Sequence, residues 1–135
     1  MKTALDQDTE IFRLLNVPTI TSVITGNIIK GRRPSDSELE DIVINTVTTG
    51  DGTRQFGVSN VNIYVKDISG PTKSGNKLLM NAARLATLTN LVKPLLEETD
   101  GEDFALWIES TRPVAEPEIN QHFMNIRIEF QFINH

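Results

Sequence analysis

The chain has 135 residues, of which 39% are hydrophobic, with a formal net charge of −5 and no cysteine. This length predicts a single domain, and the size scaling of folded proteins lets such a domain bury about two thirds of its surface without metals or disulfides. The lack of cysteine excludes disulfide frameworks, thiolate zinc sites and cysteine nucleophiles. The acidic balance argues against a general nucleic-acid-binding surface.

The sequence gives no sign of membrane insertion or export. No apolar run approaches the roughly 18 residues that a bilayer-spanning helix needs. The first eight residues, MKTALDQD, lack the apolar stretch of a secretory signal. We therefore expect a soluble protein that has no membrane partner and stays where it is made.

The N-terminal third begins with a predicted helix over residues 4–15, because apolar residues there share one side and acidic residues come early. Asn16-Val17-Pro18 ends it, since the residue before a proline avoids the α region. Residues 20–24 fit a helical turn or a strand. Gly26-Asn27 splits two short apolar pairs and indicates a turn or short hairpin, and Arg32–Ser37 follows as a polar loop.

A long hairpin is predicted next. Ile42–Thr48 is rich in β-branched residues and is predicted to be a strand. Phe56–Val65 is predicted to be the second strand of the hairpin. Val61, Ile63 and Val65 face one way, whereas Asn60, Asn62 and Tyr64 face the other. Residues 49–55 form the predicted tip, where Gly50 and Gly52 allow a tight turn.

The second half is predicted to contain a long helix and two strands. Ser69–Gly75 is predicted to be a flexible connection. Apolar residues at helical spacing predict a helix over residues 75–98. We expect a kink or an early end at Pro94, and the helix to end at Asp100-Gly101. Phe104–Glu109 reads as a short strand and Thr111–Ile119 as a proline-containing loop. In the final strand, Phe123–Phe132, apolar and polar residues alternate, which predicts one buried face.

Together these elements predict an α+β fold. We expect a two-layer sandwich in which a mainly antiparallel four-stranded sheet carries a long helix and a shorter N-terminal helix on one face. The apolar face of the last strand is expected to pack on the long helix.

No motif in the sequence predicts an active site, a cofactor or a metal. His122 and His135 lack the partners that a metal or general-base site requires. The acidic run at residues 97–103 has no calcium-loop spacing, and neither Gly50-Asp51-Gly52 nor Ser74–Lys77 matches a phosphate-binding fingerprint. We therefore expect a protein that is not an enzyme.

Two surface features admit a second interpretation. Lys30, Arg32 and Arg33 form the one basic cluster, which is either a solvated loop or a contact with an acidic neighbour such as a second subunit or a DNA backbone. The polar faces of the hairpin and of the last strand are either solvent-facing or a subunit interface.

The chain resembles the small tail-completion proteins of long-tailed bacteriophages, which are akin to tail terminators and head–tail joining proteins. The likeness covers residues 5–133 and rests on the order helix, strand hairpin, long helix, two strands. The segments that carry it are Gly26–Pro34, Asp41–Val47, Gly57–Val65 and Phe123–Phe132. The hydrophilic segment Ser35–Glu40 and the Thr111–Ile119 loop depart from the family pattern.

The resemblance implies a non-enzymatic virion structural protein, encoded by a phage or prophage, that forms an oligomeric ring. Such a ring is typically a hexamer at the tail end or the head–tail joint, assembles in the host cytoplasm, and adjoins tail-tube or connector proteins. No cofactor and no sequence-specific nucleic-acid partner is implied. A small bacterial ligand-binding or regulatory domain with no virion role is the alternative.

Ring subunits need two different complementary patches, because heterologous contacts close a ring by rotation. We expect these patches on the hairpin tip, the Lys30–Asp36 loop, the Thr111–Ile119 loop and the polar sheet face. The candidate subunit-interface residues are Lys30, Arg32, Arg33, Asp51, Arg54, Gln55, Asn60, Asn62, Tyr64, Arg112, Glu116, Arg127 and Glu129.

Overall fold

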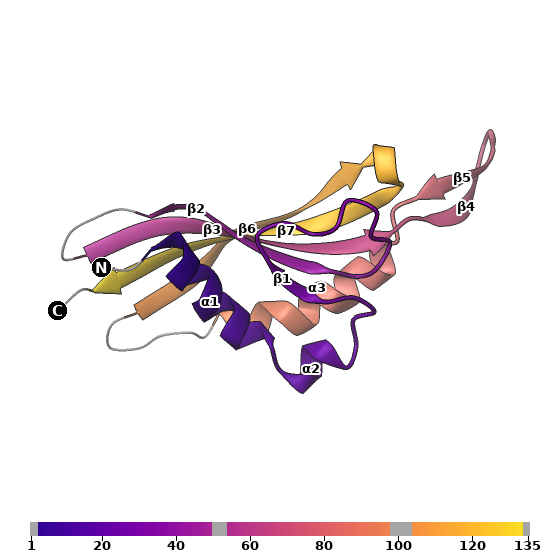
Figure 1. The fold of residues 1–135 in the computed structure, drawn as a ribbon. Coiled ribbons are helices and arrows are strands. Elements are labelled where there is room, and N and C mark those ends of the chain that lie inside the picture. Colours follow the sequence, from indigo (N-terminus) through magenta and orange to yellow (C-terminus); the bar gives the residue numbers. More distant parts are fainter. Residues whose placement is uncertain (1–2, 50–53, 98–103, 134–135) are drawn as a thin grey trace.

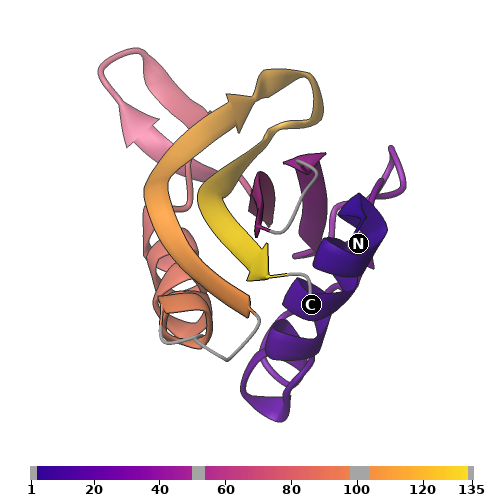
Figure 2. The ribbon, with the colours of Figure 1, turned by 90° about the vertical axis from the view of Figure 1, so that its left-hand side faces the viewer.

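The structure is a computed structural model that describes residues 3–49, 54–97 and 104–133. In chain order its elements are α1 (Ala4–Leu15), α2 (Pro18–Thr21), β1 (Ile28–Lys30), β2 (Ile42–Thr49), β3 (Arg54–Lys66), β4 (Ile68–Thr72), β5 (Gly75–Leu79), α3 (Ala82–Glu97), β6 (Phe104–Glu116), the 3-10 turn η1 (Pro117–Ile119) and β7 (Gln121–Ile133). Figures 1 and 2 show the helices lying on one side of a long twisted sheet.

The main sheet has five strands in the order β1-β2-β3-β7-β6. All neighbours pair antiparallel except β1, which runs parallel to β2 with Ile28 opposite Ile42. The predicted α+β class is therefore confirmed, whereas the four-stranded antiparallel sheet is wrong. Ile28 and Ile29 belong to a parallel edge strand and not to a short hairpin, because their partner lies beyond the polar loop.

The predicted hairpin and last strand are confirmed and form the centre of the sheet. Val61 lies opposite Ile126 and Ile63 opposite Met124, so the apolar faces of β3 and β7 coincide. Asn60, Asn62 and Tyr64 point to the other face, as predicted from the alternation. The predicted hairpin tip at residues 49–55 falls largely outside the described residues.

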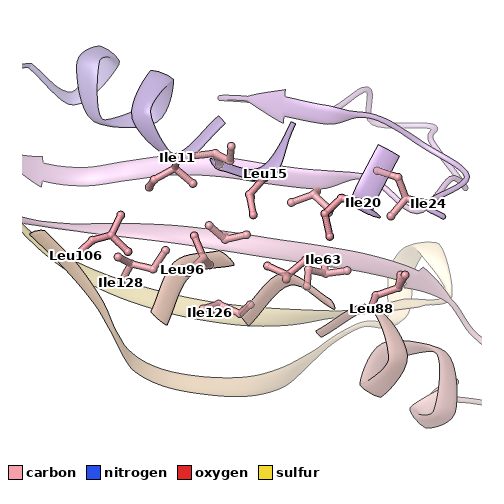
Figure 3. Packing of buried hydrophobic residues seen from close by; sticks show 14 of the residues in the cluster. Ile11, Leu15, Ile20, Ile24, Ile63, Leu88, Leu96, Leu106, Ile126 and Ile128 are labelled. Carbon is pink, nitrogen blue, oxygen red and sulfur yellow. The ribbon is translucent and has the colours of Figure 1, made fainter. Parts of the chain in front are cut away.

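The core lies between the sheet and the helices. Ile11 and Leu15 of α1, Ile20 of α2, and Leu88 and Leu96 of α3 join the inward residues of the strands in one buried cluster. Figure 3 shows Ile63, Ile126 and Ile128 among the side chains of this buried cluster. The predicted packing of the last strand on the long helix is thus confirmed. None of the described helices is long and apolar enough to cross a bilayer.

The N-terminal helix matches its predicted bounds because a capping box starts it. The Thr3 hydroxyl accepts a hydrogen bond from the Asp6 backbone N–H, and the Asp6 carboxylate accepts one from the Thr3 N–H. A second, short helix, α2, follows at Pro18–Thr21. The first residues of the 20–24 segment are therefore a helical turn and not a strand.

The predicted helix over residues 75–98 is wrong in its first turns. Residues 68–79 form the β4–β5 hairpin, a separate two-stranded sheet, and α3 starts only at Ala82. Gly75 has φ +104, a left-handed value that favours glycine and closes the hairpin turn. The helix continues past Pro94 to Glu97, and the predicted close at Asp100-Gly101 lies outside the described residues.

The predicted strand over residues 104–109 is confirmed but is longer than expected, and the predicted loop over residues 111–119 is wrong as far as Glu116, because only Pro117–Ile119 lie outside the strands. β6 continues to Glu116 and pairs with β7 almost along its whole length, with an irregularity between Ile108 and Ser110. Pro113 is tolerated because β6 is the edge strand, where a backbone N–H can point away from the sheet without a partner.

Candidate assembly surface

The face of the sheet opposite the helices carries most of the predicted interface residues. Asn60, Asn62 and Tyr64 of β3 lie beside Arg127, Asn125 and Phe123 of β7 on this open face. Arg112 and Trp107 of β6 continue it toward the edge, where they lie opposite Asn125 and Glu129. The strand alternation therefore brings residues from three strands together.

The polar groups of the open face pair across strands. The Asn125 amide donates hydrogen bonds to Asn60 Oδ1 at 3.1 Å and to Asn62 Oδ1 at 2.7 Å. Arg127 Nε donates to Glu109 Oε2 at 2.7 Å, and both side chains remain over two fifths exposed. These contacts order the face while leaving its charges accessible to a partner.

One end of the open face is covered by the loop between β1 and β2. Arg33 lies in this loop, and its guanidinium carbon is 3.9 Å from the centre of the Tyr64 ring. Arg33 Nε donates to Asp41 Oδ2 at 3.1 Å and Arg33 Nη1 to Gln121 Oε1 at 2.8 Å. The Arg33 side chain is only 9% exposed and that of Asp41 only 2%. Arg33 therefore fastens the loop to the sheet.

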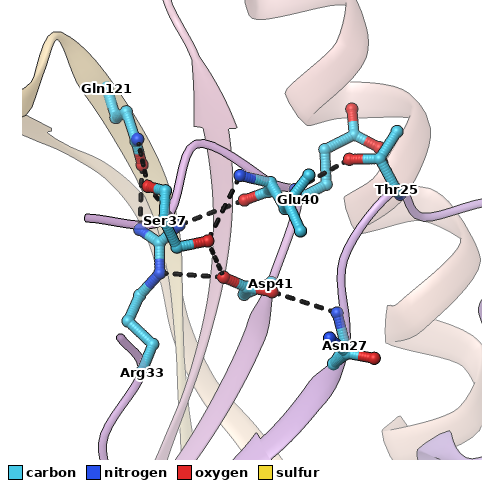
Figure 4. Close-up of polar contacts among 8 residues, drawn as sticks. Thr25, Asn27, Arg33, Ser37, Glu40, Asp41 and Gln121 are labelled. Carbon is cyan, nitrogen blue, oxygen red and sulfur yellow. Dashed lines mark hydrogen bonds and ion pairs between the residues drawn. The ribbon is translucent and has the colours of Figure 1, made fainter. Parts of the chain in front are cut away.

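The Arg33 network also includes the segment just before β1 (Figure 4). Asp41 accepts hydrogen bonds from the Asn27 backbone N–H at 3.0 Å and from Ser37 Oγ at 2.6 Å. Gln121 Nε2 donates to the Ser37 carbonyl at 2.8 Å, which joins the loop to β7. Every oxygen of the buried Asp41 carboxylate is thus paired, as a buried charge requires.

A second ion pair ties the same loop to the long helix. Arg84 Nε donates to Glu40 Oε2 at 2.7 Å, and Arg84 Nη2 donates to Glu40 Oε1 and to the Val23 carbonyl, each at 2.8 Å. The hydrogen bonds from Arg84 hold the pKa of Glu40 below its ordinary value, against the opposing effect of burial. The pKa of Arg84 is raised by the same pairing. The loop is therefore held at both ends.

A small hollow of about 190 Å³ lies beside the Arg33 loop and is lined by Tyr64 and Glu116. Burial, followed by the negative charge of Glu116, raises the pKa of Tyr64. The phenol is therefore a neutral hydrogen-bonding group at physiological pH.

The predicted interface residues divide into accessible and buried ones. Arg33 and Gln55 are buried, so within one chain they present little or no side-chain surface to a partner. Lys30 and Arg32 are exposed, and Lys30 Nζ lies 5.3 Å from the centre of the Phe12 ring. Asp51 lies outside the described residues, and Arg54 begins β3 opposite Ile133. The remaining members share the open face and its β6 edge, namely Asn60, Asn62, Tyr64, Arg112, Glu116, Arg127 and Glu129.

Sequence reasoning missed an exposed apolar surface on a projecting hairpin. The β4–β5 hairpin, which we call the arm (residues 68–79), projects beyond the end of the main sheet (Figure 1). Its Ile68, Leu78 and Leu79 are 49%, 53% and 39% exposed. Leu78 fits the helical spacing of α3, which concealed the strand; the turn residues from Ser69 to Gly75 were the signal for a hairpin.

A second apolar group lies on the open face near the other end of the sheet. Phe56 and Trp107 are 54% and 40% exposed, and with Val58 they line a hollow of about 300 Å³. Val47, 60% exposed, lies in a β-bulge of β2 next to Val58. Trp107 Nε1 donates to Glu129 Oε2 at 3.3 Å.

The described residues contain no group of three or more histidine, aspartate or glutamate side chains arranged to hold a metal ion. No protein-family model matches the sequence, and a search of curated proteins returns no match.

Proposed function

We propose that this chain is a non-enzymatic structural subunit of a homo-oligomeric ring, typically a hexamer, at the tail end or head–tail joint of a long-tailed bacteriophage. The subunit acts in the virion, where its neighbours are further copies of itself and tail-tube or connector proteins.

The observation that carries this proposal is the arm. Three large apolar side chains stand on a two-stranded hairpin that projects from the domain, outside the buried core. An isolated two-stranded hairpin is marginally stable in water, and exposed apolar groups on it favour a partner surface. A projecting apolar element of this kind is typical of subunits that hold on to a neighbour.

The rest of the fold supports the same proposal. The order of helix, strand hairpin, long helix and two strands on which the resemblance rests is kept, with the arm added before the long helix. The open sheet face presents ordered polar groups, and β1 and β6 are edge strands of the main sheet. Open faces and strand edges are surfaces on which assemblies form.

A ligand-binding domain is a weaker proposal. Such a domain gathers apolar and polar groups inside a concave site. Here the exposed apolar side chains that lie together are on a projecting hairpin and on one face of a sheet. This distribution favours contact with a macromolecular surface.

The DNA on either side of the gene provides the first test. We expect genes for portal, major capsid, tail-tube or tape-measure proteins next to it, because virion genes are clustered by assembly stage. Metabolic or regulatory neighbours on both sides would contradict the virion role and return the search to a ligand pocket.

A further inference from the structure

Most of the exposed large apolar side chains of the described residues form two groups near opposite ends of the main sheet, whereas Leu5 of α1 and Leu39 of the loop between β1 and β2 stand apart. One group is on the arm, and the other is on the open face around Phe56 and Trp107. β3 connects them, since Phe56 lies near its start and the arm begins just after its end at Lys66. At about 3.3 Å per residue the two groups are roughly 30 Å apart, so the arm cannot fold back onto the apolar group of its own chain.

The arm has one face that combines apolar groups with a positive charge. Ile68 pairs with Leu79, and Gly70 pairs with Lys77, so these four residues share one face of the hairpin. The Leu79 side chain lies over Gly70, where an added Cβ would come within 2.7 Å of Leu79 Cδ1. The arm carries Lys73 and Lys77 and no acidic residue. We call Ile68, Leu79 and Lys77 the arm face.

The apolar group on the sheet lies around a negatively charged residue, Glu129. Phe56, Val58 and Trp107 surround Glu129, which lies opposite both Val58 and Trp107 in the sheet register. Among the described residues Glu129 forms no ion pair, in contrast to Glu109, which is paired with Arg127. We call Phe56, Val58, Trp107 and Glu129 the sheet patch.

We propose that the arm face of one copy docks on the sheet patch of a second copy. This inference rests on the proposed ring and names the contact that builds it. Ile68 and Leu79 cover the aromatic side chains of Phe56 and Trp107, and Lys77 pairs with Glu129. Apolar surface leaves water at the centre of the contact while opposite charges fix its register.

The positions of the two surfaces also determine the type of assembly. A contact between two different surfaces is heterologous, so a bound pair still offers one free sheet patch, on one copy, and one free arm face, on the other. Such contacts join copies head to tail and close into a ring when the rotation between copies permits. The arm and patch lie at opposite ends of β3, which suits a chain of this kind better than a two-fold dimer.

Cysteine cross-linking tests the contact directly, because the chain has no cysteine of its own. One variant carries Leu79→Cys and a second carries Phe56→Cys, and the two are mixed at equal concentration under oxidising conditions. We expect a disulfide-linked pair that contains one copy of each variant. Leu39→Cys replaces Phe56→Cys in the control, since Leu39 is 47% exposed in the loop between β1 and β2, outside the sheet patch, and no linked pair is expected.

Charge reversal provides a second and independent measurement. Lys77→Glu places two acidic groups together, so we expect the association constant of the full chain to fall about tenfold or more. Adding Glu129→Lys to the same chain restores the opposite charges and is expected to recover association. Lys73→Glu, at the turn of the same arm, is the matched control and is expected to have a smaller effect.

The outcomes separate this contact from the proposed ring. If the wild-type chain forms a ring but no Leu79–Phe56 cross-link appears and charge reversal has no effect, the contact is wrong and the ring stands. Cross-linking of Leu79→Cys only to itself would also overturn the contact. If the wild-type chain stays monomeric at every concentration and no cross-link forms, the contact is overturned; the flanking genes still decide the virion role.

Discussion

Arg33 stacks on Tyr64, with its guanidinium carbon 3.9 Å from the ring centre, and pairs with the buried carboxylate of Asp41 at 3.1 Å. The planar guanidinium suits this site because one face meets the aromatic ring while its edges donate hydrogen bonds. A cation that the sequence places in a polar loop thus fixes that loop to the sheet.

The Arg33–Asp41 pair predicts a large loss of stability when the arginine is removed. In Arg33→Met the Asp41 carboxylate, 2% exposed, loses its charged partner. We expect the free energy of unfolding to fall by roughly 3–5 kcal/mol, as for other broken buried pairs. Urea unfolding measures it. Arg32→Met is the control, since Arg32 is exposed, and an equal loss in both variants would contradict the structural role of Arg33.

The close packing around Gly26 predicts that a larger residue there lowers stability. A Cβ at this position would meet the Glu40 carbonyl carbon and oxygen, each at 2.8 Å, and also Asp41 Oδ1. Because backbone atoms cannot move aside as a flexible side chain does, we expect Gly26→Ala to lower the free energy of unfolding by roughly 1–3 kcal/mol. Thermal unfolding provides the measurement, with Ser35→Ala as control because Ser35 is exposed in the loop between β1 and β2. A Gly26→Ala protein as stable as wild type would show that the segment around Gly26 packs differently.

The Glu40–Arg84 pair predicts a pH dependence of stability. The pKa of Glu40 is lower in the folded chain than in the unfolded chain because Arg84 donates to the charged carboxylate. Protonation therefore favours unfolding, so the stabilisation is present at neutral pH and is lost as the pH falls through the folded-state pKa.

We expect Glu40→Gln to be less stable than wild type at neutral pH and to lose less stability on acidification. Urea midpoints at neutral pH and at a pH below the ordinary glutamate range compare the two proteins. Glu38→Gln is the control, because its carboxylate is 70% exposed and lies 3.5 Å from Lys66. A wild-type and a Glu40→Gln protein with parallel acid profiles would rule out this contribution.

The charge of the chain predicts that duplex DNA does not bind measurably at physiological salt. The net charge is −5, and one of the three clustered cations, Arg33, is held inside the protein. Too few cations remain for the phosphate contacts that give duplex affinity. Fluorescence anisotropy with labelled DNA measures the binding, and a submicromolar dissociation constant would contradict this prediction.

The parts of the fold that could be predicted are those with strong local patterns. The capped helix at residues 4–15, the β-branched hairpin and the alternating last strand all follow from spacing within a few residues. The arm could not be recognised in this way. Leu78 extends the helical spacing of α3, and only the pairing of Leu78 and Leu79 with β4 assigns them to a strand.

Other features depend on contacts between distant residues. The three residues of β1 become a strand through parallel pairing with β2, which no local pattern indicates. Pro113 suggested a loop, yet an edge strand accommodates it. The side chains that share the open face were predicted where alternation decides their direction, on β3 and β7. The burial of Arg33 depends on Gln121, 88 residues away, and escaped local reasoning.

Deletion of the gene from the phage or prophage that carries it tests the central claim most directly. Electron micrographs of the resulting lysate show whether heads and tails are made and joined. We predict heads separate from tails, or tails of irregular length, with normal particles restored by the wild-type gene and not by a chain lacking residues 68–79. Intact virions with joined tails of uniform length from the deletion strain would contradict the account.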